Sequence, residues 1–205
     1  GATAWRQARE NARAQCDARA DAIATAVSTH INAYEDTVRA AAAVLEGRQD
    51  IEQDSFYAFV EKLQVPTRRS GVNGLGFARH VRHEDRDAYV ASQRARYGDA
   101  FTIHPAGDRS EYVVVDLLYP DAPGMRPLLG KDVLAETVRR GAIESAHDSG
   151  EPAAAPLVAL GDATRGSTAL PGFLLYAPVY AASVAARAGV DDRRRLLRGS
   201  ATAGM

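Results

Sequence analysis

Two histidines and a glutamate stand close together in the sequence, as His80, His83 and Glu84. Imidazoles three residues apart, followed by a carboxylate, are ligand types found in zinc-dependent hydrolases. The local pattern puts His80 at the end of a strand and His83 at the start of a helix, so a third ligand would have to come from a distant part of a chain with only five histidines. We therefore interpret these histidines as solvated side chains and expect no metal or other cofactor.

Other catalytic patterns are absent from the sequence. It contains neither a Gly-x-Ser-x-Gly nucleophile elbow nor a phosphate-binding loop, and Gly71, Gly74 and Gly76 have the wrong spacing for a dinucleotide-binding turn. Residues 191–195, two aspartates followed by three arginines, are more typical of a solvated charged turn than of a phosphate grip. We expect no enzyme activity in this chain. A small metal-dependent or hydrolytic enzyme domain is the alternative.

The predicted strand at residues 111–119 carries a carboxylate among apolar side chains. Alternation divides the side chains of a strand between two faces. One face is apolar and the other adds polar groups: Val113, Val115 and Leu117 on the first, Tyr112, Val114, Asp116 and Leu118 on the second. We assign the apolar face to the N-terminal helix and the other face to a pocket beneath the loop at residues 120–132. Pockets are typically apolar with a few orienting polar groups, as here.

Neighbouring segments add further candidates for the wall of this pocket. Gly76 and Ala78 share a strand face, and their small size leaves room for a ring. Leu174 and Tyr176 form an opposite wall. The predicted ligand-binding residues are thus Gly76, Ala78, Tyr112, Val114, Asp116, Asp132, Leu174 and Tyr176. In the alternative interpretation, Asp116 ends its strand in solvent and Gly76 only permits close packing.

The length and composition suit a folded domain that does not bind nucleic acid. The 205 residues are 46% hydrophobic and 25% charged, with a net charge of −1, which offers no electrostatic footprint for DNA or RNA. A single cysteine, Cys16, excludes an intrachain disulfide and leaves the compartment undecided. Residues 166–186 carry no charge, but prolines and glycines interrupt them, so we expect a buried strand there and neither a signal peptide nor a spanning helix in the chain.

A long helix is predicted from Trp5 to about Glu46, where the sequence has no glycine or proline. Its apolar stripe steps by four, four and three residues, an eleven-residue period that predicts a nearly straight rod. At 1.5 Å per residue the helix would be on the order of 60 Å long, more than this domain needs for its own core. We therefore expect a stalk that pairs with a second copy. A purely structural dimerisation module is a further alternative.

The rest of the chain, after the long helix, is predicted to be an α+β body with an antiparallel sheet and flanking helices. Strands that pair locally, interrupted by helices, favour this class. The predicted strands are residues 74–81, 100–104, 111–119, 153–160, 172–180 and 196–203, and the predicted helices are a short one from Asp54, ended by Val65 and Pro66, and two near residues 84–97 and 135–147.

Short motifs occur along residues 74–180 in an order that resembles the CHASE family. They are Gly76-Phe77-Ala78, Arg109-Ser110-Glu111-Tyr112, Leu129-Gly130-Lys131-Asp132, Arg139-Arg140 through Gly150-Glu151-Pro152, and Pro178-Val179-Tyr180. The resemblance implies a long helix followed by PAS-like modules, of which the membrane-distal one binds the ligand. We accordingly divide the chain into a stalk helix (1–50), a PAS-like ligand-binding module (51–182) and the start of an incomplete membrane-proximal module or tail (183–205).

The resemblance also implies a function and a location. CHASE-like domains are extracytoplasmic input domains of membrane-bound histidine kinases, of two-component systems, and of nucleotide cyclases such as diguanylate cyclases. We therefore expect a periplasmic sensor domain, anchored by membrane helices outside this chain and forming a homodimer through its N-terminal helix. Its ligand would be a small organic molecule. Plant relatives bind an adenine-type hormone through an aspartate, so a cytokinin-like purine is one option.

Overall fold

The computed structural model describes residues 2–46, 48, 51–63, 74–160, 170–181 and 188–204. The expected end of the short helix at Val65 and Pro66 lies outside these residues. The chain divides into two compact units, residues 1–36 and 37–205, whereas we placed the end of the helical segment at residue 50.

The predicted long helix is confirmed as one element, α1 (Ala2–Leu45), of 44 residues. Its sequence is rich in alanine and contains neither glycine nor proline, so no residue interrupts the backbone hydrogen bonds. In the first unit Ile23 and Val27 of the apolar stripe are open to solvent, 65% and 52% exposed. In the second unit the same stripe continues at Val38, Ala42 and Leu45, which are all buried.

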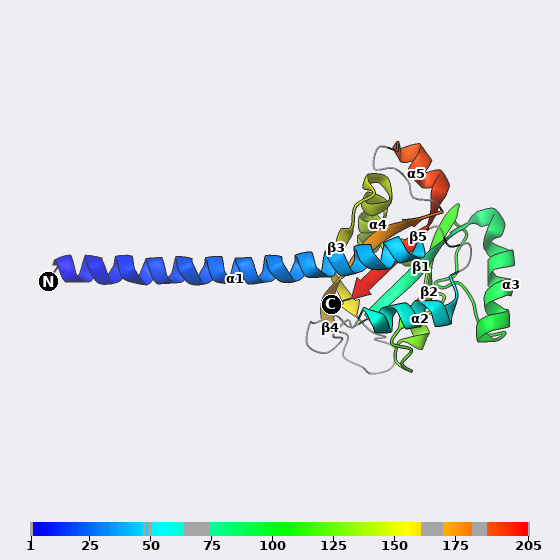
Figure 1. The fold of residues 1–205 in the computed structure, drawn as a ribbon, viewed down its shortest axis with the longest axis horizontal. Helices are drawn as coiled ribbons and strands as arrows, with labels where there is room; N and C mark the ends of the chain where they lie inside the picture. Colours follow the sequence, from blue (N-terminus) through cyan, green and yellow to red (C-terminus); the bar gives the residue numbers. More distant parts are fainter. Residues whose placement is uncertain are drawn as a thin grey trace. The chain divides into compact units, whose positions relative to one another are not determined.

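The second unit is built on a five-stranded antiparallel sheet, which confirms the predicted α+β class (Figure 1). The strands lie in the order β2-β1-β5-β4-β3, and every neighbouring pair is antiparallel. Their bounds are β1 (Gly74–Arg82), β2 (Glu111–Tyr119), β3 (Ala153–Leu160), β4 (Leu170–Tyr180) and β5 (Leu197–Gly204). The sheet therefore matches the expected PAS-like architecture.

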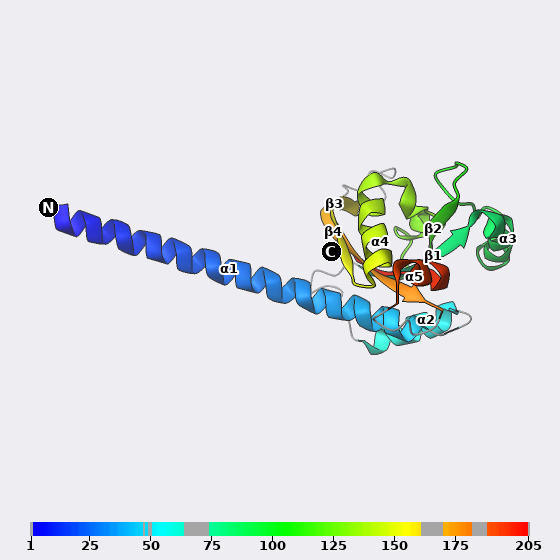
Figure 2. The same cartoon turned by 90° about the horizontal axis from the view of Figure 1, so that it is seen from above.

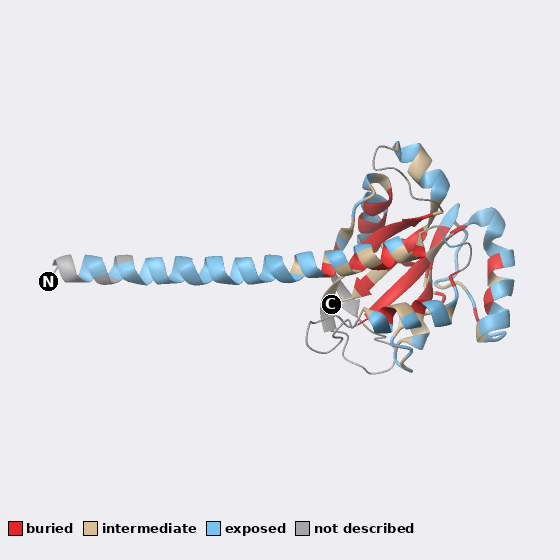
Figure 3. Cartoon of the chain, in the orientation of Figure 1, coloured by how far each residue is buried: buried red, intermediate tan, exposed pale blue. Residues whose placement is uncertain are grey.

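Helices cover both faces of this sheet. Four follow α1, namely α2 (Gln53–Lys62), α3 (Arg86–Tyr97), α4 (Thr137–Ser149) and α5 (Val190–Leu196), with short 3-10 turns at η1 (His83–Asp85), η2 (Arg126–Leu128) and η3 (Val133–Ala135). Helix α4 lies on one face, while α2 and the last turns of α1 lie on the other (Figure 2). Buried residues are concentrated in the strands and on the helix faces turned towards them (Figure 3).

The C-terminal strand has a different place from the one we assigned to it. We expected residues 183–205 to begin an incomplete second module or a tail. In the structure β5 lies in the middle of the sheet and pairs with β1 on one side and β4 on the other. Its small side chains fit this place, because Ala201 and Ala203 are buried between the two neighbouring strands.

The predicted strand at residues 100–104 does not form. Only His104 makes an isolated bridge, parallel to Lys131, and the amide of Asp132 donates to the His104 carbonyl at 2.7 Å. Residues 130–132 also bond the outer edge of β2, where Gly130 N donates to Val115 O and Val115 N donates to Lys131 O, both at 2.9 Å. This segment thus covers part of an edge that would otherwise be free to pair with another chain.

A β-bulge in β2 changes which side chains share a face. The register between β1 and β2 shifts between Phe77 and Ala78, and Asp116 is the residue left without a partner in the ladder. An extra residue in one strand disturbs the simple alternation of side chains. Leu117 consequently pairs opposite Phe77, and it does not continue the face of Val113.

Two glycines of the second unit should respond in opposite ways to substitution by alanine. Gly199 in β5 has a φ of +153°, and a Cβ there would lie 2.1 Å from the carbonyl oxygen of Ala78. Gly141 is exposed in α4, and a Cβ there would meet no atom within 4 Å. We expect Gly199→Ala to lower the free energy of unfolding by about 2–4 kcal/mol, and Gly141→Ala to raise it by about 0.5–1 kcal/mol.

Urea denaturation followed by circular dichroism measures both effects. Equal small changes in the two variants would contradict the placement of β5 against β1.

Candidate functional site

The structure does not bring the eight predicted ligand-binding residues into one pocket. It divides them between the two faces of the sheet. Ala78 and Tyr176 belong to a cluster beneath α4, and Leu174 packs against it. Tyr112 and Val114 belong to a second cluster on the opposite face, with Val81, Tyr89 and Phe101 as its other buried members.

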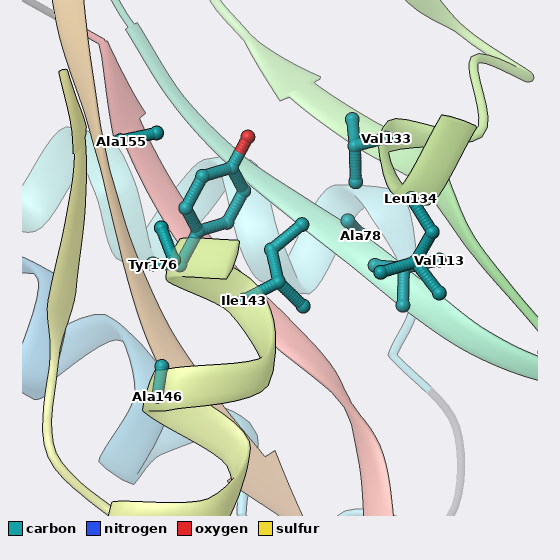
Figure 4. Close-up of a cluster of buried hydrophobic side chains, with 9 residues drawn as sticks. Ala78, Val113, Val133, Leu134, Ile143, Ala146, Ala155 and Tyr176 are labelled. Atoms are coloured by element: carbon teal, nitrogen blue, oxygen red, sulfur yellow. The ribbon is translucent and has the colours of Figure 1, made fainter. Parts of the chain in front are cut away.

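The α4-side cluster is apolar and rich in alanine (Figure 4). Its buried members are Ala78, Val113, Val133, Leu134, Ala142, Ile143, Ala146, Ala155 and Tyr176. Val113 and Val115 therefore face α4, whereas we had assigned their face to the N-terminal helix. Figure 4 shows the Tyr176 ring between Ala155 and Ile143, with its hydroxyl directed away from Ala146.

Tyr176 is the polar group at the centre of this cluster. It is 1% exposed, and its hydroxyl has no hydrogen-bond partner among the described residues. Burial raises the pKa of the phenol, and the positive charge of Arg139 acts in the opposite direction. A buried hydroxyl without a partner costs roughly 1–3 kcal/mol, so proteins rarely retain one without a use.

Asp132 lies at the border of the same cluster and holds the loop to the sheet. Its Oδ1 accepts hydrogen bonds from the amides of Val113 and Leu134, both at 3.1 Å. Arg109 Nη1 is 3.3 Å from Oδ2, an ion-pair distance, although the geometry is not that of a hydrogen bond. Burial raises the pKa of this carboxyl, and the two amides lower it in part.

Asp116 is enclosed on the opposite face beneath α3. The carboxylate is fully buried, and Arg79 Nε donates to its Oδ2 at 2.8 Å, while the Tyr97 hydroxyl donates to its main-chain oxygen at 2.9 Å. Its Oδ1, the Tyr89 hydroxyl and the Gln93 amide oxygen are buried without hydrogen-bond partners among the described residues. Burial and the charge of Asp116 raise the pKa of Tyr89. Asp116 is thus an internal ion-pair partner and does not end its strand in solvent.

Gly76 serves close packing. A Cβ at this position would lie 2.9 Å from the Leu117 carbonyl oxygen and 3.0 Å from Thr202 Oγ1. Only glycine fits there without displacing a neighbouring strand. The room that we expected above Gly76 for a ligand ring is therefore filled by strand atoms.

The histidine pair is bonded within the protein. His80 Nε2 lies 2.8 Å from Glu111 Oε2, and His83 Nδ1 lies 3.0 Å from the Arg109 carbonyl oxygen. Across the described ranges, no three His, Cys, Asp or Glu side chains are grouped so that they could hold a metal ion. His80 thus connects β1 to the start of β2, and His83 connects η1 to the segment that precedes β2.

A cavity of about 610 Å³ lies at the outer edge of β2. The described residues that line it come from four segments: Gln53 and Tyr57 of α2, Arg96 and Tyr97 of α3, Ala100, Phe101, Thr102 and His104 of the following coil, and Leu118, Asp121, Met125, Arg126, Pro127 and Leu129 of β2 and its loop. The sequence predicted a pocket beneath the loop at residues 120–132, and five residues of that loop line this cavity. The contributions of α2, α3 and the coil after α3 were not predicted, because no local pattern connects these segments. None of the eight predicted residues lines it.

Comparison with protein families agrees with this architecture. The family model of the CHASE domain matches residues 49–205, which is more than half of the chain. The chain belongs to the CHASE-domain family. CHASE domains are extracytoplasmic sensory domains of membrane receptors and are not catalytic. A search of curated proteins found no match.

The CHASE match includes β5, in agreement with its central place in the sheet. It also covers both sheet faces and the cavity. No helix within the described ranges has the length and apolarity needed to cross a bilayer.

A buried histidine connects β5 of this CHASE domain to α4. His147 Nε2 lies 2.8 Å from Ser200 Oγ, and Tyr180 donates to the His147 carbonyl oxygen at 3.0 Å. Burial lowers the pKa of His147 to about 4, and His80 adds to this shift, while the negative charge of Glu111 opposes it. The imidazole is therefore neutral in the folded state at neutral pH.

This histidine should make stability depend on pH. The unfolded chain takes up a proton near pH 6.5 and the folded one only near pH 4, so stability is complete above pH 6.5 and is lost as the pH falls towards 4. The loss due to His147 is roughly 3 kcal/mol. We expect His147→Gln to flatten the unfolding free energy between these two pH values, as measured by urea denaturation.

The exposed His83 offers a matched control, and His83→Gln should retain the slope of the wild type. An unchanged slope in His147→Gln would show that other groups cause the pH dependence.

Proposed function

We propose that this CHASE domain is the small-molecule-sensing input of a transmembrane receptor, with a histidine kinase or a diguanylate cyclase as its output. It acts on the periplasmic side of the membrane and is anchored by helices outside this chain. The ligand binds between the sheet and α4. The observation that carries this assignment is the buried Tyr176 hydroxyl without a partner, set in an apolar cluster.

The chemistry of the α4 side suits binding better than catalysis. Small-molecule pockets are largely apolar and contain a few polar groups that orient the ligand. Around Tyr176 most side chains are alanines and aliphatic residues, and the polar groups are its own hydroxyl, the buried Arg139 guanidinium and the Asp132 carboxylate at the border. A hydrolase would instead need a nucleophile hydrogen-bonded to a base. This composition supports a sensor over the alternative of a small hydrolytic or metal-dependent enzyme.

Four of the predicted residues form the proposed ligand site: Ala78, Asp132, Leu174 and Tyr176. Ala78 and Leu174 contribute apolar surface, and Tyr176 and Asp132 offer a hydroxyl and a carboxylate oxygen, Oδ2, that no described residue hydrogen-bonds. A flat ligand with both donor and acceptor atoms would satisfy them, and a cytokinin-like purine has these features. Asp116 and its neighbours, on the opposite face, support the sheet beneath the site.

Signalling through this domain requires two conformations for which the ligand has different affinities. The exposed stripe of α1, with Ile23 and Val27, provides an apolar surface for the same helix of a second copy. An isolated helix in solvent buries little apolar surface and is only marginally stable. Pairing with a second copy would bury the apolar stripe of α1. We infer that a homodimer forms through α1 and that ligand binding near α4 changes how the two copies pair. A dimerisation module that binds no ligand, which is the alternative function, would pair through α1 in the same way.

Two tyrosines on β4 allow a matched test of the ligand site. Tyr176 has an unpartnered hydroxyl, whereas Tyr180 donates to the His147 carbonyl oxygen. In the absence of ligand, we expect Tyr176→Phe to keep or raise the free energy of unfolding and Tyr180→Phe to lower it by about 1 kcal/mol. With the ligand, we expect Tyr176→Phe to lose about tenfold in affinity and Tyr180→Phe to bind as the wild type does.

The ligand for this test comes from native mass spectrometry of copurifying molecules and from a thermal-shift screen that includes adenine derivatives. Calorimetric titration then measures the affinity of both variants. A ligand whose affinity is equal in wild type and Tyr176→Phe does not bind at Tyr176, and the proposed site would be rejected. Loss of stability in unliganded Tyr176→Phe would likewise contradict it, because it would mean that the hydroxyl already has a partner.

A further inference from the structure

The cavity at the outer edge of β2 is unlike the α4 side in position and in chemistry. Its volume of about 610 Å³ is within the range of small-molecule sites, roughly 300–1,000 Å³. It is separated from the α4-side cluster, since none of the residues around Tyr176 lines it. We propose that this cavity is a second binding site, for an aromatic carboxylate, and this goes beyond the sensing function proposed above.

Aromatic rings form one wall of the cavity. Tyr97 and Phe101 are stacked, with ring centroids 5.9 Å apart and planes inclined by 20°. Tyr57 contributes a third ring, which packs edge-on against Tyr119 at 5.6 Å. Such rings offer a flat apolar surface, on which a planar ligand gains both burial and stacking.

Aliphatic side chains from β2 and its loop line the cavity as well. Leu118 comes from the strand, and Met125 and Leu129 come from the loop that follows it. Methionine adapts to ligands of different outline, because its side chain is unbranched and polarizable. Together with the aromatic wall these residues select for an apolar body in the ligand.

The charges of the lining favour a negatively charged group on that body. Arg126 and Asp121 neutralise each other through hydrogen bonds of 3.1 and 3.3 Å. Arg96 forms no ion pair with any described residue, and its guanidinium lies over the Tyr97 ring, 5.9 Å from the centroid. Two arginines and one aspartate thus leave one positive charge, next to the aromatic wall.

The guanidinium of Arg96 is suited to a carboxylate in particular. Its planar fork donates two parallel hydrogen bonds to the two oxygens of a carboxylate, a geometry that lysine cannot offer. Arg96 and Phe101 already lie against the Tyr97 ring, so the ligand ring would pack against Tyr57 and the edges of the Tyr97–Phe101 pair, with its substituent directed to this fork. The cavity therefore fits a flat aromatic ring system that carries one carboxylate.

The segments that a ligand would connect give the site a role in the sensor. Tyr57 and Gln53 lie on α2, the helix that follows α1 in the sequence, whereas the opposite wall belongs to α3 and to the loop after β2. Tyr97 also donates to the Asp116 main chain at the bulge of β2. An occupied cavity would hold α2 and α3 together at the sheet edge.

Titration of the intact chain with 2-naphthoate tests the proposal, with the neutral amide 2-naphthamide as the comparison. We expect the wild type to bind the carboxylate at least tenfold more tightly than the amide. Arg96→Gln should weaken the binding of 2-naphthoate about tenfold. Arg86→Gln, on the same helix and equally exposed but outside the cavity, should leave it unchanged.

A second variant tests the space itself. Ala100 is exposed and lines the cavity, so Ala100→Trp fills it without touching the core and should abolish binding. Tyr176→Phe should leave the affinity for 2-naphthoate unchanged, which separates this site from the one near α4. No heat of binding in the wild type, or binding that neither Arg96→Gln nor Ala100→Trp weakens, would overturn the proposal.

Discussion

The pairing of β5 with both β1 and β4 is the interaction on which the rest of the second unit depends. The order β2-β1-β5-β4-β3 consists of two pairs of strands that only β5 connects. Without it, β1 and β4 would each have an unpaired edge, and α4 would cover two separate halves. Its backbone conformation at Gly199 and its alanines allow a close approach from both sides. The two sheet faces, and every site on them, exist because this strand completes the sheet.

The two faces have different chemistry because a single residue interrupts one strand. At the bulge, Asp116 leaves the ladder of β2 and joins Arg79 under α3. The α3 side thereby holds a buried ion pair, whereas the α4 side holds an apolar cluster with the Tyr176 hydroxyl inside it. Both sides contain buried polar atoms without hydrogen-bond partners among the described residues, but on the α3 side they surround a charged ion pair, and on the α4 side the Tyr176 hydroxyl lies in an apolar cluster. This apolar setting is the basis of our proposal that the ligand binds on the α4 side.

Local patterns in the sequence predicted the elements well, and their long-range arrangement poorly. The absence of glycine and proline predicted α1, and alternation predicted β2. The central place of β5 could not be read from Gly199-Ser200-Ala201, because small residues have weak strand preference and the pairing is with distant segments. The bulge at Asp116 takes Leu117 away from the face of Val113, which strict alternation could not predict. Which helix covers that face depends on contacts between distant segments, and we assigned the wrong one. Ala78, Leu174 and Tyr176 do pack in one cluster, and their role in ligand binding stays a prediction. The loop at residues 120–132 was expected to cover a pocket, but no pattern along the chain indicates the part of the cavity at Arg96.

The position of β5 also determines the order in which this domain can assemble during synthesis. Gly204 pairs with Gly74, so the ribosome must release residues 130 positions apart before this contact forms. Two hairpin-like halves, β1 with β2 and β3 with β4, precede it and keep open edges meanwhile. Contacts between such distant residues form slowly, because a long loop must close first. The sheet of the nascent chain is therefore in two parts until β5 has been synthesised.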